Sequence, residues 1–543
     1  YHNDAAYTLN LDNYDISGGY TVIGSKITTA SLYDRYSRLQ VNKTSQTSRF
    51  EVVGHSLTLT DTLITSDQVS FVARLGKDSV SHPAVQLEYR IPQQHVQLNK
   101  VRKGGFRNSM FSDTFHQVDI RCDAMSWDLG SGKMDFYIVA GKQEVAAEFE
   151  SFDYFNMNRL TGLSNAAGFN PLMAAATIIG RKKKNSITID EMMQFTRKER
   201  HIAANGMLIG TQMGFFDYHP FEDYYSISRK GLHYYFVATG KKDYDDLVFS
   251  SLNRNNEGKK NATIDFNSKS LSITGAQNFR LSDSLGIQLL PDQQSMEVIG
   301  NKVFRFNGKI VVKNFTFYGE FVLEYEKFLV NLNRIDSITF IPLDIFKKGG
   351  KLQLAGNFQF GKSGKLYLNS PDNKSGRKKL PEYPKLEIPE GLTVHFNEKG
   401  RHHLFSDQMY FKATSLSLDS LNTRDPVIPG TFTTAGIFKP IKDRLVLLPD
   451  SSMGMSHTAG GAYPVYGSQT AFKAASKIVL NKRGISSSGE LHHLASVLNA
   501  DKISFFEDHS EASGSSGRIT EKQLGAAYFP QVNISGYTMR WEP

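Results

Sequence analysis

Two adjacent histidine pairs are the most visible candidates for metal binding in this sequence. They are His402-His403 and His492-His493. Neighbouring side chains of a β-strand point to opposite faces, so neither pair can chelate one ion from within a strand. No cysteine or carboxylate at a ligand spacing completes a site around them. The sequence therefore predicts surface histidines and no metal ion.

Nucleophiles and paired carboxylates give no catalytic signature either. The single cysteine, Cys122, lies in an alternating run, which favours a buried small hydrophobe over a nucleophile. The sequence has no Gly-x-Ser-x-Gly elbow, phosphate-binding glycine loop or His-Glu-x-x-His motif. Asp119, Asp123, Asp128 and Asp135 cluster in sequence, and carboxylates from different strands can pair for glycoside cleavage. Turns also favour aspartate, so we predict no catalytic residue, no cofactor and no enzyme activity.

Ten basic residues form the candidate interaction surface of this chain. They are Arg181, Lys182, Lys183, Lys184, Arg197, Lys198, Arg200, Arg377, Lys378 and Lys379. Basic runs can contact an anionic polymer or nucleic acid, but they are more often solvated faces. The flanking β-rich segments carry no concentrated basic stripe, so nucleic acid is an unlikely partner.

Short runs of alternating or wholly apolar residues fill most of the chain, and this period of two is typical of β-strands. Between 262 and 340 such runs follow one another with little but turns between them. Asn307-Gly308 lies between two of them and predicts a type I′ hairpin turn. We expect a mainly β fold, with repeated short antiparallel strands in stacked sheets or a β-solenoid.

One α-helical insert interrupts the β pattern. The sequence predicts helices at 156–163, 170–179, 189–195 and 197–214, then a hairpin of strands at 214–218 and 224–227, and a short helix or loop at 244–255. Pro171 suits a first helical turn, and Asp190-Glu191 place acid near a helix start. Three helices followed by a two-stranded wing is the order of a winged-helix module.

The length of 543 residues is too great for one ordinary core. We predict a β-rich domain at 1–150, the winged-helix-like insert at 151–245, a β-repeat domain at 246–368, a linker at 369–384 and a β-rich domain at 385–543. The proposed linker is polar and contains prolines and a basic triplet.

The amino-acid composition further restricts the possible classes of protein and partner. Hydrophobic residues make up 40% of the chain and charged residues 22%, which is normal for a folded protein. The net charge of +9 mildly favours anionic partners. One cysteine excludes an intramolecular disulfide, and no apolar run is long enough for a transmembrane helix. Both ends look like cuts in a longer chain, so we expect the targeting signal to lie outside this segment.

Three late stretches resemble a known class of proteins. They are Gly460 to Gly467, Leu480 to Ile485 and Ile534 to Pro543. Together with the helical insert and the step from Ile335 to Ile338, they make the chain similar to a segment of the very large, uncharacterised β-rich cell-envelope proteins of the Bacteroidota. The resemblance implies export and a place in the periplasm or at the outer membrane. It transfers no catalytic residue.

The leading expectation is a non-enzymatic envelope scaffold whose sheets and helical insert engage partner proteins or envelope polymers. The alternative is a glycan-binding or carbohydrate-active β protein, because aromatic residues are dense at 218–235 and 304–328 and exposed rings stack on sugars. Core packing is the commoner use of such rings. A third possibility is nucleic-acid binding through the insert.

Overall fold

The structure is a computed structural model that describes most of the chain. The described residues are 7–11, 13–31, 36–42, 49–101, 106, 109–139, 145–219, 223–252, 260–282, 285–343, 357–397, 405–421, 424–467 and 469–543. The His402-His403 pair lies outside these ranges.

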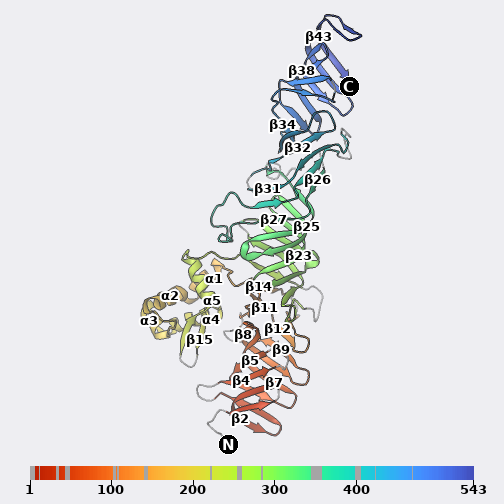
Figure 1. Ribbon diagram of the computed structural model, residues 1–543. Coiled ribbons are helices and arrows are strands. Elements are labelled where there is room, and N and C mark those ends of the chain that lie inside the picture. The colour runs from red at the N-terminus through yellow and green to blue at the C-terminus, as the bar shows by residue number, and fades with distance from the viewer. Residues whose placement is uncertain are drawn as a thin grey trace. The chain divides into compact units, whose positions relative to one another are not determined.

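Antiparallel strands dominate the described residues, which confirms the prediction of a mainly β protein. The chain forms two compact units. The first unit contains residues 1–310, 322–328 and 370–379, and the second contains 311–321, 329–369 and 380–543. The α-helices of the described residues lie in the first unit, in one cluster between 157 and 238 (Figure 1).

The first unit begins with seven strands. They are β1 (Tyr7–Leu11), β2 (Tyr14–Ile23), β3 (Lys26–Ala30), β4 (Ser37–Asn42), β5 (Arg49–Gly54), β6 (Ser56–Leu59) and β7 (Leu63–Leu75). Strands β2, β3, β6, β7, β5 and β4 pair in a closed cycle. Side chains that alternate along these strands, such as Leu39, Phe50, Val52 and Phe71, are buried.

Two series of strand pairs then share the long strands β8 (Asp78–Arg90) and β23 (Val303–Val312). One series runs from β8 through β9 (His95–Lys100), β12 (Ala124–Asp128), β13 (Lys133–Tyr137), β18 (Ala262–Asp265), β19 (Ser270–Ile273) and β22 (Met296–Gly300). The other runs through β10 (Phe111–Asp113), β11 (Val118–Arg121), β14 (Ala147–Ser151), β17 (Val248–Ser251), β20 (Ala276–Ser282) and β21 (Ile287–Pro291).

Aromatic side chains pack between these strands. Phe111 of one series lies 5.4 Å from Phe136 of the other, measured between ring centroids. Trp127 stacks on Phe266 at 5.0 Å and is completely buried. These four aromatic residues therefore belong to the core of the first unit.

The long strands change partner along their length. Tyr14 to Ser17 of β2 pair with β4, whereas Gly19 to Ile23 pair with β3, and Gly18 at the junction has φ +156°. The prediction of a hairpin turn at Asn307-Gly308 is wrong, because both residues lie inside β23. Gly308 has φ +147°, and a Cβ atom there would lie 2.3 Å from the Leu290 carbonyl oxygen. The glycine thus permits a close strand approach within the sheet.

The helical segment is an insertion between two strands that pair with each other. Strand β14 ends at Ser151 and β17 begins at Val248, and Glu150 lies opposite Val248 in the antiparallel register. We call residues 152–247 the helical module. The sheet is continuous across the points where the module leaves and returns.

The module contains α1 (Met157–Ala167), α2 (Pro171–Lys182), α3 (Ile189–Thr196), α4 (Arg200–Gln212), the hairpin of β15 (Phe216–His219) and β16 (Tyr224–Ile227), and α5 (Arg229–Ala238). The four predicted helices and the hairpin are confirmed, as are Pro171 in the first turn of α2 and the acidic start of α3. Helix α5 was not predicted. The segment predicted as a helix or loop from residue 244 instead contains β17.

The module has a core of its own. Leu163, Leu172, Met207, Phe215 and Tyr234 are completely buried in it. Side-chain oxygens cap four helices: Asn156 for α1, Asn170 for α2, Ser228 for α5, and Thr188 for α3, where Glu191 completes a capping box. This packing and these caps explain why local sequence predicted most of the module correctly.

The second unit is also antiparallel. Strand β24 (Phe315–Glu324) is divided between the units, and β25 (Leu329–Phe340), β27 (Gly364–Tyr367), β28 (Lys385–Ile388) and β31 (Leu416–Leu418) pair in that order. A second sheet contains β26 (Asn357–Phe360), β29 (Leu392–His395), β30 (Met409–Ala413), β32 (Ile428–Thr434), β33 (Ile441–Leu447), β34 (Met453–His457), β37 (Ile478–Asn481), β38 (Gly484–His493), β39 (Ser496–Phe505), β40 (Ser510–Ile519) and β43 (Val532–Trp541). Strands β35 (Ala462–Pro464) and β36 (Thr470–Ala474) join it through β38, and β41 (Lys522–Leu524) pairs with β42 (Ala527–Phe529).

Candidate functional site

The helical module joins the sheet through two adjacent connections, residues 152–155 and 243–247, which we call the neck. The backbone N–H of Asp245 donates to the Asp153 carbonyl at 2.8 Å, and that of Phe155 donates to the Asp245 carbonyl at 3.3 Å. The Ser151 hydroxyl donates to the Asp245 carboxylate at 2.7 Å. The two connections are therefore bonded to each other where they leave the sheet.

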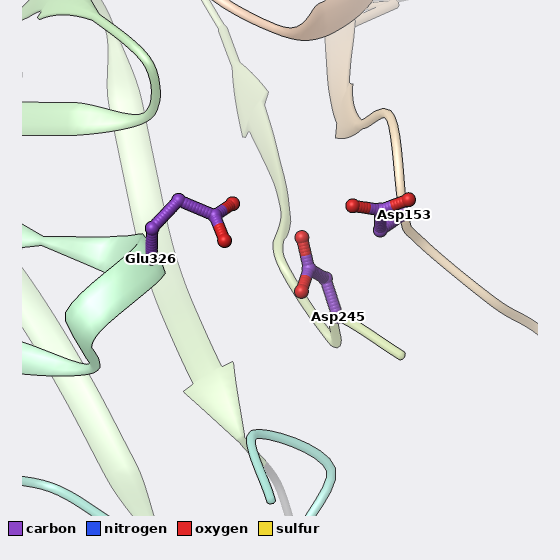
Figure 2. Close-up of side chains that lie close together, drawn as sticks. All are labelled: Asp153, Asp245 and Glu326. Carbon is purple, nitrogen blue, oxygen red and sulfur yellow. The ribbon is translucent and has the colours of Figure 1, made fainter. Parts of the chain in front are cut away.

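A buried lysine holds the neck. The ammonium of Lys302, between β22 and β23, lies 2.7 Å from Asp245, 3.3 Å from Asp153 and 2.7 Å from Glu326. Its side chain is 0% exposed. Figure 2 shows the three carboxylates turned toward one another, one from each side of the neck and one from the short helix η3 (Tyr325–Lys327). We call these four residues the neck cluster.

A second lysine extends the neck cluster. Lys374 lies 2.7 Å from Glu326 and 3.8 Å from Asp245. Next to it, the Ser375 backbone N–H donates to Asp243 of the neck at 3.2 Å. Both Lys374 and Ser375 are buried, so this part of the predicted 369–384 linker packs within the first unit.

The opposite charges of the neck cluster stabilise one another in their ionised forms. Burial by itself raises the pKa of Asp153, but the ammonium groups of Lys302 and Lys242 outweigh it and hold that pKa well below its usual range. Burial likewise lowers the pKa of Lys302, yet the carboxylates of Asp245, Asp153 and Glu326 raise it above the usual lysine value. Lys302 is therefore a protonated ion-pair partner and a poor nucleophile.

Three carboxylates this close are a possible cation site, since their oxygens lie within 4.8 Å of one another. The Lys302 ammonium lies among them and supplies the positive charge that a metal ion would bring. The arrangement is consequently an ion-pair cluster that fastens the module to the sheet. Sequence analysis missed it, because its members come from positions between 153 and 374.

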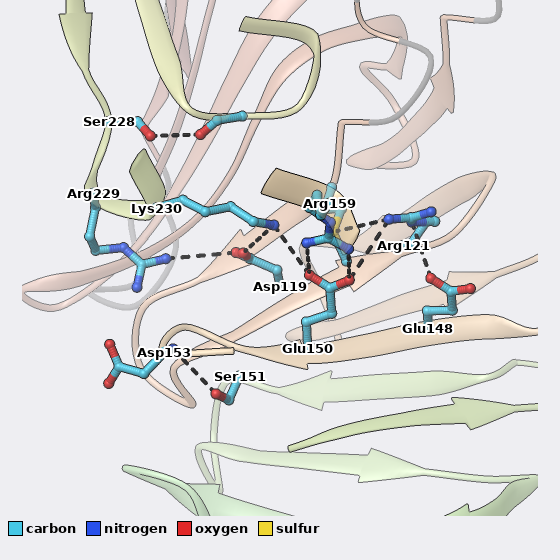
Figure 3. Close-up of polar contacts among 12 residues, drawn as sticks. Asp119, Arg121, Glu148, Glu150, Ser151, Asp153, Arg159, Ser228, Arg229 and Lys230 are labelled. Atoms are coloured by element: carbon cyan, nitrogen blue, oxygen red, sulfur yellow. Dashed lines mark hydrogen bonds and ion pairs between the residues drawn. The ribbon is translucent and has the colours of Figure 1, made fainter. Parts of the chain in front are cut away.

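A second charge cluster lies where the module meets β11 and β14 (Figure 3). The Glu150 carboxylate accepts two hydrogen bonds from Arg159 of α1, at 2.5 and 3.0 Å, and one from Lys230 of α5 at 3.2 Å. Lys230 and Arg229 also approach Asp119 at 3.9 Å each. Glu150 is almost completely buried, so this pairing is strongly desolvated.

Replacement of Glu150 by glutamine should reduce the acid sensitivity of the first unit. Burial raises the pKa of Glu150, but Arg159 and Lys230 outweigh it and lower that pKa from 4.5 to about 2. A folded-state pKa below the unfolded one gives stability that is present above pH 4.5 and is lost as the pH falls toward 2. The Glu150→Gln variant should therefore take up about one proton fewer on unfolding in this range. Urea unfolding at a series of pH values measures it, and equal pH slopes in both proteins would contradict the assignment.

The predicted basic surface is partly neutralised. Lys182 and Lys184 pair with Glu191 at 2.7 and 2.6 Å, and Arg200 pairs with Asp190. The acidic residues in the first turn of α3 thus form ion pairs with both basic groups, 181–184 and 197–200. Nearly all of these basic residues are exposed, including Lys183, Arg197 and Lys198.

The third basic group, residues 377–379, lies apart in sequence from the other two, and one of its residues packs on the module. The guanidinium of Arg377 lies over the Tyr244 ring at 4.8 Å and donates to the Val237 carbonyl at 3.5 Å. Lys378 pairs with Asp372 at 3.3 Å and is largely exposed, as is Lys379.

The other candidate residues have local roles. Cys122 is buried, as predicted, and burial raises the pKa of its thiol to about 12. Asp128 accepts backbone hydrogen bonds in the turn before β13, as predicted, and Asp135 pairs with Lys260 at 2.6 Å. His492 contacts Glu490, whereas its neighbour on β38, His493, contacts Thr470.

Large apolar side chains are exposed on the module. They are Met157, Phe195, Leu208, Tyr218, Leu232 and Phe236. Leu232 and Phe236 are one turn apart on α5 and are 41% and 38% exposed, so they share one face of that helix. Sequence analysis missed this pair together with α5.

The fold and these features define a mainly β, antiparallel protein with a helical module inserted into a continuous sheet. Comparisons with protein-family models, with curated proteins and with solved structures find no match. Among the described residues, no helix has both the length and the apolar character needed to span a membrane.

Proposed function

We propose that this chain is a non-enzymatic scaffold or interaction protein of the cell envelope, periplasmic or associated with the outer membrane, and that its helical module docks a partner protein. The observation that carries the proposal is the insertion of the module between β14 and β17. Those strands pair directly, so the module adds a separately packed body that the sheet does not need for its own pairing.

The exposed face of α5 supports protein docking. Leu232 and Phe236 form an apolar pair beside Arg229, which is 49% exposed on the same helix. Aromatic and arginine side chains contribute strongly to protein interfaces. The ion pairs at Glu150 and Lys302 hold the module against the sheet, which keeps this face in a fixed position.

The placement in the envelope rests on the sequence resemblance. In this proposal the β-strands form repeated layers, as in stacked sheets or a solenoid, and their faces and edges provide further binding surface.

Two alternative functions, nucleic-acid binding and glycan cleavage, would require other features of the structure than protein docking does. The order of α2, α3, α4 and the β15–β16 hairpin suits a winged-helix-like module, in which α4 would enter a DNA groove. Helix α4 carries one arginine and no lysine, and that arginine, Arg200, already pairs with Asp190, which favours a protein partner. For glycan cleavage, the carboxylates that converge at the neck are bonded to a buried lysine, so they are poorly placed for acid–base catalysis.

The full chain carrying Leu232→Glu and Phe236→Glu should lose a partner that the unmodified chain retains. Tagged chains would be isolated from their native envelope under mild detergent, and co-purifying proteins would be quantified by mass spectrometry. A stoichiometric protein should fall at least tenfold with the double variant, because two buried glutamates would oppose docking.

The matched control is Val22→Glu with Ile23→Glu, which adds the same charges at two exposed apolar positions of β2. This control should retain the partner. Equal recovery with both double variants would contradict docking through α5. Recovery of nucleic acid that disappears at high salt would favour the winged-helix alternative, and binding of the pure chain to a glycan array would favour the glycan alternative.

A further inference from the structure

A tyrosine, a histidine and an aspartate form a hydrogen-bonded series in the second unit. His457, at the end of β34, contacts Asp443 of β33 through Nδ1 at 2.5 Å. Its Nε2 contacts the hydroxyl of Tyr463 in β35 at 2.8 Å. No feature of the sequence singled out this set, because its members lie on three strands.

The contacts define the role of each group. Asp443 is oriented by the Arg444 backbone N–H, which donates to its other oxygen at 2.8 Å. A carboxylate on Nδ1 keeps the histidine proton there, so Nε2 is left to accept the proton of the Tyr463 hydroxyl. The Gly460 backbone N–H points at the same hydroxyl oxygen from 3.4 Å. A donor at this position favours negative charge on that oxygen.

The series is accessible to small molecules. The side chains of His457 and Asp443 are 16% and 25% exposed, and Tyr463 is half-buried. Gly460 and Gly461, in the short connection between His457 and Tyr463, have open space where a Cβ atom would lie. A reagent can therefore approach the tyrosine from the loop side.

We propose that Tyr463 is a nucleophilic tyrosine that accepts an acyl group from an activated ester. The Tyr463 oxygen would form a bond to the acyl carbon, His457 Nε2 would take the phenolic proton, and the bond from the acyl carbon to the leaving oxygen would break. The leaving alcohol or phenol departs with that proton, so the products are acyl-tyrosine and the free alcohol. Tyr463 and His457 are the reacting residues of this step, which modifies the chain once without turnover and so goes beyond its proposed scaffold role. Asp443 is a positioning residue.

The experiment treats the full chain with p-nitrophenyl acetate, follows release of p-nitrophenolate, and locates the acetyl group by peptide mass spectrometry. Tyr463 should be acetylated at least tenfold faster than two other tyrosines of the same unit. Tyr528 is 60% exposed but has no histidine contact in the described structure, and it controls for exposure. Tyr466 donates to the Phe506 and His509 carbonyls, and burial raises its pKa to about 12, so it controls for position in the loop.

Three variants separate chemistry from packing. His457→Gln keeps a polar side chain but removes the base, and it should lower Tyr463 acetylation at least tenfold. Asp443→Asn should lower it similarly, and Asp443→Glu should restore part of the rate, because only a carboxylate fixes the histidine proton on Nδ1. If Asp443 had only a structural role, Asp443→Glu would not acetylate Tyr463 faster than Asp443→Asn. Circular dichroism confirms that each variant is folded.

Either of two results would overturn the proposal. The first is acetylation of Tyr463 at the rate of Tyr528. The second is a rapid acetylation that persists in folded His457→Gln protein, which would assign the reactivity to exposure alone.

Discussion

Replacement of Lys302 by methionine should lower the free energy of unfolding of the first unit by about 3–5 kcal/mol. Methionine fills a similar volume but leaves the buried Asp245 carboxylate without its nearest ammonium partner. It also removes one of the two lysines that pair with Asp153, which retains Lys242. Urea unfolding followed by the fluorescence of Trp127 measures the effect. Trp127 is buried in the first unit, and the only other tryptophan, Trp541, is replaced by phenylalanine in all samples.

The matched control is Lys327→Met. Lys327 follows Glu326 in the chain, but its side chain is 68% exposed and pairs only with Glu324 in the described structure. Its replacement should change stability by no more than about 0.5 kcal/mol. Adding Asp245→Asn to Lys302→Met should recover part of the loss, because it removes one uncompensated charge. Equal stability of the two lysine variants would show that the neck cluster contributes nothing.

Replacement of Gly308 by alanine should cost about 3 kcal/mol of the same unfolding free energy. The new Cβ atom would lie 2.3 Å from the Leu290 carbonyl oxygen and 2.9 Å from the Asp292 nitrogen, both of them backbone atoms. The strand would also have to hold φ near +147° with a side chain present. The Trp127 signal again reports the change, since Gly308 belongs to the first unit.

Gly162→Ala is the control for this substitution. Gly162 lies inside α1, where a Cβ atom has open space, so alanine should stabilise the helix by about 0.5–1 kcal/mol. The two glycine substitutions are thus expected to have opposite signs. A loss at Gly308 below about 0.5 kcal/mol would mean that β23 and β21 separate readily.

Local signals predicted the parts of the fold that local interactions determine. Alternating runs identified most strands, and Pro171 with Asp190 and Glu191 located two helices, because caps and periodicity act over a few residues. The same reasoning failed at Gly308. Asn-Gly usually makes a turn, but here contact with another strand requires the glycine, and sequence does not show which strand will approach.

The charge clusters illustrate a second limit of prediction from the sequence. Lys302 is one of many lysines in the sequence, and only the fold brings it to Asp153, Asp245 and Glu326. Likewise His457 meets Asp443 and Tyr463 by strand pairing, although the stretch that includes Tyr463 attracted notice as a sequence resemblance. When the fold brings together common residue types from distant positions, a single sequence contains no pattern that predicts the contact.

The position of the helical module has a consequence for how such chains can diversify. Glu150 and Val248 face each other in the register of β14 and β17, so a tight turn could close this hairpin and leave the sheet intact. One module could therefore be exchanged for another without redesign of the framework. Lys302 limits that freedom, because any replacement would have to bring its own carboxylates to the buried ammonium or be accompanied by a change at position 302. Lineages that lose or swap the insert should thus change residue 302 together with it.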